Sequence, residues 1–174
     1  MTRALAPLGP PSALVFATTN GGKHRRLREH LDRVECDARA RCVAVDVVEI
    51  QADTVRLVAV DKARRACERL KRDVDDDECV LVHDCGLCAR ALGGFPGPVT
   101  KYFNFTVGGA GLATLLRDVD DRAACWDETI VCARPSDGAM RVFSRERAYD
   151  GEIGTPVRWR RWRDVPSRSV CLLY

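Results

Sequence analysis

The chain has 174 residues, of which 46% are hydrophobic, and its 28 basic and 25 acidic residues give a formal net charge of +3. This length is enough for one domain with a sizeable core, and the nearly balanced charge does not call for a nucleic-acid partner. No apolar run is long enough to span a bilayer, and the first residues lack the apolar segment of a signal peptide. We therefore expect a cytoplasmic protein with no membrane or nucleic-acid partner.

Short apolar runs and charged amphipathic segments alternate along the first half of the chain, which favours an α/β fold. After a leader at residues 1–11, the expected elements are a strand over 12–18, a helix over 23–31, a strand over 43–48, a helix over 54–72 and a strand over 79–82 that ends at His83-Asp84. A stretch rich in Gly and Pro follows at 91–98, then a short helix over 111–116 and two strands over 123–133 and 141–148.

The segment Thr18-Thr19-Asn20-Gly21-Gly22-Lys23 joins the first expected strand to the first helix. Glycines let backbone amides approach an anion closely, and the following helix presents its positive end to it. Lys23 adds a full positive charge. The segment is not a Walker A loop, so a phosphate-binding loop and a simple strand–turn–helix connection both remain open.

Two carboxylates follow expected strands. Glu49 comes at the end of the second strand and Asp84 at the end of the third. Acidic side chains at the carboxyl ends of sheet strands face the crevice in which open α/β sheets bind ligands. Together they could share Mg²⁺, which prefers oxygen ligands; a solvated carboxylate is the alternative.

The nine cysteines have no repeating spacing, and an odd count without a secretion signal indicates free thiols. Cys85 and Cys88 form a CxxC pair. The sequence holds no second such pair, and none of its three histidines forms a spaced pair with it. We therefore interpret both residues as ordinary thiols.

Several segments match one set of motifs in order and spacing. They are Phe16–Lys23, Glu49-Ile50-Gln51, Asp61-Lys62-Ala63, Val82–Leu87 and Ala91–Phe103. This set resembles the inosine triphosphate pyrophosphatase family, and the resemblance is clear over residues 12–105. It implies an α/β domain over residues 12–157, with an elongated mixed sheet, flanking helices and two lobes around a nucleotide cleft.

The resemblance also implies an enzyme that hydrolyses purine nucleoside triphosphates such as ITP, dITP and XTP to monophosphate and pyrophosphate. Its cofactor would be Mg²⁺, with Mn²⁺ as an alternative, and it would form a homodimer. The implied substrate-binding residues are Thr18, Thr19, Asn20, Lys23, Lys62 and Lys101. Glu49 and Asp84 would ligate the metal, and Asp84 would be the catalytic base.

The lysines agree with these roles. Apart from Lys71, every lysine of this Arg-rich chain falls on a matched position, namely Lys23, Lys62 and Lys101. The lysine ammonium is a compact point charge, whereas the arginine guanidinium is planar with donors in fixed directions. The two residues are therefore not interchangeable as phosphate ligands.

The sequence departs from the family at two places. His83 stands where the family usually has an acid, and the family's later base-recognition motifs are replaced by an atypical basic and aromatic tail at residues 158–174. The alternative functions are therefore a catalytically weak or inactive nucleotide-binding paralogue, or a nucleic-acid or partner-binding module that uses the tail.

Overall fold

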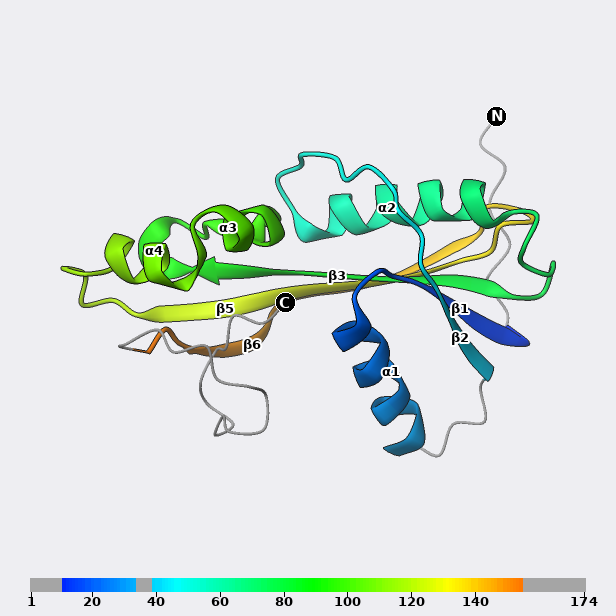
Figure 1. Ribbon diagram of the computed structural model, residues 1–174, viewed down its shortest axis with the longest axis horizontal. Coiled ribbons are helices and arrows are strands. Elements are labelled where there is room, and N and C mark those ends of the chain that lie inside the picture. Colours follow the sequence, from blue (N-terminus) through cyan, green and yellow to red (C-terminus); the bar gives the residue numbers. More distant parts are fainter. Residues whose placement is uncertain (1–10, 34–38, 155–174) are drawn as a thin grey trace. The chain divides into compact units, whose positions relative to one another are not determined.

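The computed structural model describes residues 11–33 and 39–154 (Figure 1). Its strands are β1 (Ala13–Ala17), β2 (Arg39–Val43), β3 (Cys79–Ala89), β4 (Pro96–Gly97), β5 (Ala123–Ala133) and β6 (Met140–Glu152). Its helices are α1 (Gly21–Arg33), α2 (Val55–Leu70), α3 (Thr100–Thr106) and α4 (Gly108–Leu115), with a 3₁₀ turn η1 at Arg90–Leu92.

The strands form one six-stranded mixed sheet in the order β2-β1-β3-β5-β6, with β4 paired to β3 beside this path. β1 runs parallel to both β2 and β3, with Ala13 opposite Arg39 and Leu14 opposite Cys79. β4 runs antiparallel to β3, with Leu87 opposite Gly97. The expected α/β class with a mixed sheet is confirmed.

The chain divides into two compact units, and three strands pass from one into the other. Unit 1 holds the residues up to Ile50 together with Leu57–His83 and Thr129–Phe143. Unit 2 holds Gln51–Arg56, Asp84–Glu128 and the residues from Ser144. The boundary therefore falls inside β3, β5 and β6.

In unit 1, β1 and the first half of β3 are covered on both faces. On one face Val15 and Val80 pack in a cluster with α2 residues such as Ala63. On the other face Phe16 and Leu81 pack in a cluster that includes Leu27 of α1. The two helices accordingly lie on opposite sides of the sheet (Figure 1). This explains the unbroken apolar runs of β1 and of the start of β3. A strand alternates between polar and apolar side chains only when one of its faces is exposed to solvent.

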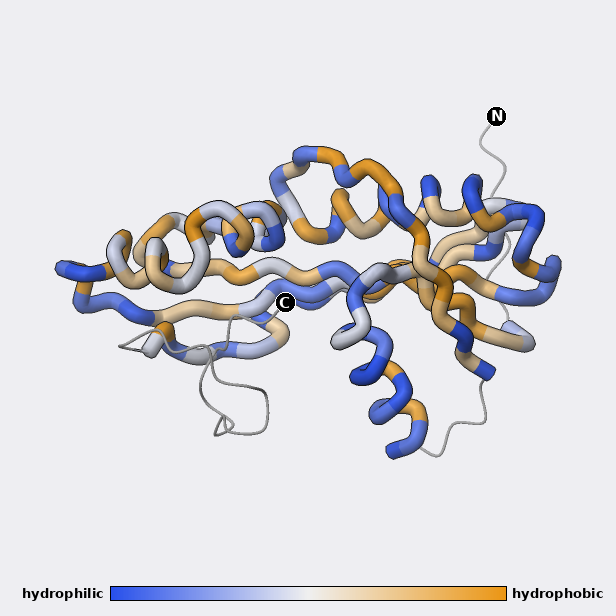
Figure 2. Tube along the Cα trace, viewed as in Figure 1, coloured by the Kyte–Doolittle hydropathy of each residue, from blue (hydrophilic) through white to orange (hydrophobic). Residues whose placement is uncertain are grey.

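Unit 2 has its own core. Leu87 of β3 and Ala124 of β5 pack with Phe103 of α3 and with Leu112 and Leu116 of the α4 region. Figure 2 shows that both strands carry hydrophobic residues beneath these helices. In the part of the chain that the structure describes, no helix has both the length and the apolar character needed to cross a membrane.

The second strand lies earlier in the chain than expected. The sequence predicts a strand over 43–48, but β2 ends at Val43 because that residue pairs with Ala17, the last residue of β1. The apolar run after it is not a strand, and its Val48 is 74% exposed. Glu49 therefore lies in an irregular segment and not at a strand end.

The third strand is longer than expected. β3 does not stop at His83-Asp84 but continues to Ala89, because its second half pairs with β4 and neighbours β5. Backbone pairing does not require apolar side chains, so polarity is a poor signal for the end of a strand. Asp84 is therefore inside a strand. The sequence also misses α3, and β6 extends beyond the expected 141–148.

The core of unit 2 can be tested on α4. Leu112 is 0% exposed and Leu115 is 48% exposed. We expect Leu112→Ala to lower the free energy of unfolding by about 2–5 kcal/mol, because it removes buried apolar surface and leaves a cavity. Leu115→Ala on the same helix should change it by less than about 0.5 kcal/mol. Denaturant unfolding of both variants measures this, and equal losses would contradict the described packing.

Candidate functional site

The loop between β1 and α1 is organised around Asn20. Its Oδ1 accepts hydrogen bonds from the backbone amides of Gly22 (2.9 Å) and Lys23 (3.1 Å). These amides belong to the first turn of α1, so Asn20 is the N-cap of that helix. Thr18 supports Asn20, because Thr18 Oγ1 accepts a hydrogen bond from the Asn20 backbone amide at 3.1 Å. Thr19 is exposed.

Lys23 is buried in the first turn of α1, with 6% of its surface exposed. Its Nζ donates to the carbonyl oxygen of His83 at 2.8 Å. A lysine is rarely so buried unless it is paired. The bond brings the ammonium to the part of β3 that immediately precedes Asp84. Thr18, Asn20 and Lys23 thus lie together at the junction of β1 and α1.

Glu49 and Lys62 form an ion pair in unit 1. Lys62 Nζ lies 2.7 Å from Glu49 Oε1. The Lys62 side chain is 18% exposed and the Glu49 side chain is 12% exposed. The irregular segment after β2 thus brings Glu49 against α2. Glu49, expected as a metal ligand, and Lys62, expected to bind substrate, therefore contact each other directly.

Asp84 is half-buried on β3. Its Oδ1 accepts from the backbone amide of Cys85 at 3.2 Å, and its Oδ2 is buried. The neighbouring backbone thus helps to orient this carboxylate.

The Gly- and Pro-rich stretch is a shaped loop in unit 2. Gly93, Gly94 and Gly97 have φ angles of 63°, 90° and 52°, and the Phe95–Pro96 peptide bond is cis. The three glycines occupy the left-handed region, which side chains rarely adopt. Phe95 packs edge to face against Phe103 of α3, with ring centroids 5.2 Å apart.

The loop is clamped onto β3 by a close backbone approach. A Cβ atom at Gly86 would lie 2.3 Å from the carbonyl oxygen of Gly97. The buried Thr100 hydroxyl accepts from the Leu87 amide at 2.8 Å and donates to that same carbonyl at 2.6 Å. Gly86 and Thr100 therefore have a structural role in addition to the residues predicted from the sequence.

Lys101 follows the clamp directly, in the first turn of α3. It is exposed, and its Nζ lies 5.6 Å from the ring centroid of Tyr102. The clamp fixes the backbone position from which the side chain of Lys101 extends.

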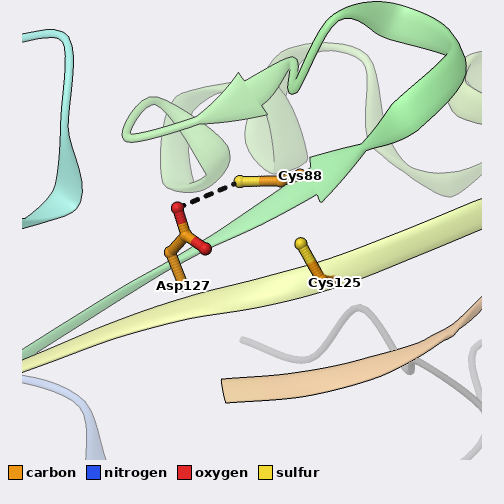
Figure 3. A group of neighbouring side chains, drawn as sticks. All are labelled: Cys88, Cys125 and Asp127. Carbon is orange, nitrogen blue, oxygen red and sulfur yellow. Dashed lines mark hydrogen bonds between the residues drawn. The ribbon is translucent and has the colours of Figure 1, made fainter. Parts of the chain in front are cut away.

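A further group of side chains was not predicted. Among residues 11–33 and 39–154, one group of at least three metal-ligating residues occurs, and it consists of Cys88, Cys125 and Asp127 (Figure 3). Their ligand atoms all lie within 4.8 Å of one another. No spacing rule finds this group, because Cys88 comes from β3 and the other two from β5.

Comparison with known proteins identifies the family. A model described as the Ham1 family matches residues 14–160. The chain belongs to the Ham1 family. The match includes every site residue named above, and it confirms the family resemblance.

Two relatives with known names match this Ham1-family chain. The "dITP/XTP pyrophosphatase" of Hyperthermus butylicus is 36% identical over 131 residues, which cover 75% of this chain and 64% of that protein. The "Inosine triphosphate pyrophosphatase 2" of Trypanosoma cruzi is 37% identical over 111 residues, which cover 64% and 52%. The chain thus spans less than two thirds of the length of either relative.

A solved structure supports the fold. The HAM1 protein from Coxiella burnetii aligns with a TM-score of 0.64 at 22% identity, covering 85% of this chain and 75% of that one. At this identity the likeness concerns the fold alone.

The expected leader at 1–11, except for Pro11, and the expected tail at 158–174 lie outside the described residues.

The clamp at Gly86 yields a stability test. We expect Gly86→Ala to lower the free energy of unfolding by about 1–3 kcal/mol, because its new Cβ collides with backbone. Gly21→Ala is the control, since a Cβ there meets no atom within 4 Å. It should change the free energy by less than about 0.5 kcal/mol. Thermal and urea unfolding measure both variants. A Gly86→Ala variant with the free energy of unfolding of the wild type would contradict the close approach of Gly86 to Gly97.

Proposed function

We propose that this Ham1-family chain hydrolyses purine nucleoside triphosphates such as ITP, dITP and XTP to the nucleoside monophosphate and pyrophosphate. The observation that carries the proposal is the match, at 36% identity over 131 residues, to a relative named dITP/XTP pyrophosphatase. That name favours an active hydrolase over an inactive paralogue. The direct test is pyrophosphate release from ITP, dITP and XTP, with ATP and GTP as comparison substrates.

Phosphate binding is assigned to the loop between β1 and α1. The Asn20 amide oxygen is used by the backbone of Gly22 and Lys23. Its amide N–H₂ group is then the part of the side chain suited to an anion, because phosphate oxygens need donors. Lys23 adds a point charge, and the positive end of α1 adds its dipole. Thr18 holds Asn20 in place, and Thr19 offers a hydroxyl on the exposed side of the loop. Lys101 supplies a second cation for phosphate.

Glu49 and Asp84 are assigned as the metal ligands, and the donor set suits Mg²⁺. Both offer carboxylate oxygens, and Mg²⁺ is usually bound by one or two carboxylates together with substrate phosphates. Lys62, at 2.7 Å from Glu49 Oε1, orients that carboxylate as the partners of ligating carboxylates do. A bound Mg²⁺ would neutralise the charge that develops on the phosphate oxygens.

Asp84 is assigned as the general base. Water attacks the α-phosphorus, the bond between that phosphorus and the bridging oxygen breaks, and pyrophosphate leaves with the electron pair. Asp84 accepts the proton of the attacking water. The backbone amide of Cys85 donates to Oδ1 of Asp84 at 3.2 Å and so helps to orient the carboxylate. Lys23 and Lys101 offset the charge on the leaving group.

The resemblance extends the proposal to a homodimeric, cytoplasmic protein. Light scattering of the purified chain tests the homodimer, and cell fractionation tests the location. Neither result bears on the assignment of the residues above.

The base assignment predicts a specific loss. Asp84→Asn should reduce turnover of ITP by about 10²-fold or more, since the amide cannot accept the proton. Its affinity for ITP, measured by calorimetry without Mg²⁺, should remain close to that of the wild type. Asp118→Asn, an exposed carboxylate on the surface, is the control and should retain full turnover. Turnover of Asp84→Asn near the wild-type value would exclude this role.

The two tasks of Asn20 can be separated by two substitutions. Asn20→Ala should lower the free energy of unfolding by about 1 kcal/mol through loss of the helix cap, and should also weaken ITP binding. Asn20→Asp keeps a capping oxygen, so stability should be retained. Its negative charge should nevertheless weaken ITP binding more than IMP binding. Thermal unfolding and calorimetry measure these effects, and wild-type affinity for ITP in Asn20→Asp would contradict the phosphate contact.

A further inference from the structure

Two thiols and a carboxylate converge in unit 2. Cys88 extends from β3, and Cys125 and Asp127 extend from the neighbouring β5 (Figure 3). Cys125 and Asp127 are two residues apart on a strand, so both face the same side of the sheet. Cys88 Sγ lies 3.5 Å from Asp127 Oδ2, and Cys125 is only 8% exposed. Three ligand atoms of the kinds found in zinc sites therefore share one small volume.

The carboxylate of this group is held in position by β6. Asp127 Oδ1 accepts a hydrogen bond from the backbone amide of Arg147 at 2.9 Å. Arg147 has a φ of 52°, an uncommon conformation for a residue with a side chain. Its guanidinium pairs with Asp150 at 2.8 Å. One carboxylate oxygen is thus anchored while the other points to the thiol, which is how protein metal sites orient their carboxylate ligands.

We propose that Cys88, Cys125 and Asp127 form a binding site for a thiophilic divalent cation, with Zn²⁺ as the best match. Thiolate and carboxylate are both zinc ligands, and zinc sites are mostly tetrahedral. Three protein ligands leave a fourth position. The pocket beside the group has a volume of about 680 Å³, and its lining includes Cys88, Cys125, Asp150 and Glu152. Water from this pocket would fill the fourth position, as in open zinc sites.

Binding exchanges two protons for the cation. Cysteine ligates zinc as the thiolate. Cys88 and Cys125 would therefore each release a thiol proton to solvent when the cation binds.

This site is separate from the proposed catalytic one. Mg²⁺ requires oxygen ligands and does not compete for thiolates. The site also differs from a CxxC pair. Cys85 and Cys88 are three residues apart on β3, so their side chains leave opposite faces of the strand. Cys85 therefore provides a matched control on the same strand.

The test is a titration of the reduced protein with Co²⁺, which replaces zinc in thiolate sites and reports them spectroscopically. One equivalent of Co²⁺ should produce a sulfur-to-metal charge-transfer band together with the visible bands of a tetrahedral ion. Zn²⁺ should abolish both, and a large excess of Mg²⁺ should not. Competition with a chromogenic chelator then gives the Zn²⁺ affinity.

Variants identify the ligands. Cys88→Ser, Cys125→Ser and Asp127→Asn should each weaken Zn²⁺ binding by more than about 10-fold, while Cys85→Ser should leave it unchanged. Circular dichroism verifies that each variant is folded. If a serine variant is unfolded, the isosteric Asp127→Asn supplies the decisive comparison.

Absence of a charge-transfer band, or a band that survives all three substitutions, would overturn the proposal. The second result would assign the metal to other thiols of the chain. None of these measurements uses pyrophosphate release, so they succeed or fail independently of the proposed hydrolase activity.

Discussion

The hydrogen-bonded position of β3 inside the sheet is the constraint on which the sites depend. Its first half pairs with β1, its second half with β4, and β5 is its other neighbour. The backbone of such a strand cannot shift by one residue without reversing the face of every side chain. The carbonyl that receives Lys23, the carboxylate of Asp84, the clamp at Gly86 and the thiol of Cys88 all lie on this one strand. Sheet register therefore determines which face each of these groups occupies.

Much of the fold follows from local patterns. The apolar runs of β1 and the start of β3 identify buried strands, and α2 shows helical spacing, because in each case the pattern reflects burial against a neighbour. The ends of strands are different. Val43 ends β2 because β1 offers no further partner, and Ala89 ends β3 well beyond the polar residues His83 and Asp84. Strand ends depend on which partner is available, and this is a property of the whole sheet.

The same distinction applies to the sites. The junction between β1 and α1 could be predicted because the residues that form it are contiguous in the sequence. The pairing of Glu49 with Lys62 could not, since it depends on the path of an irregular segment back to α2. The group of Cys88, Cys125 and Asp127 is hidden for a related reason. Motif searches examine spacing along the chain, whereas these ligands meet across two strands.

The composition of α1 has a consequence for motion. Lys23 is the buried residue of this helix, Leu27 is its partly buried contact with the core, and most of its other residues are polar. A helix held by so little apolar surface opens locally at a low free-energy cost. Its amides should therefore exchange with solvent deuterium faster than those of α2. A triphosphate bound at the amino end of α1, as proposed above, would stabilise the state in which this helix is folded. Ligand affinity and the order of the helix would therefore be thermodynamically linked.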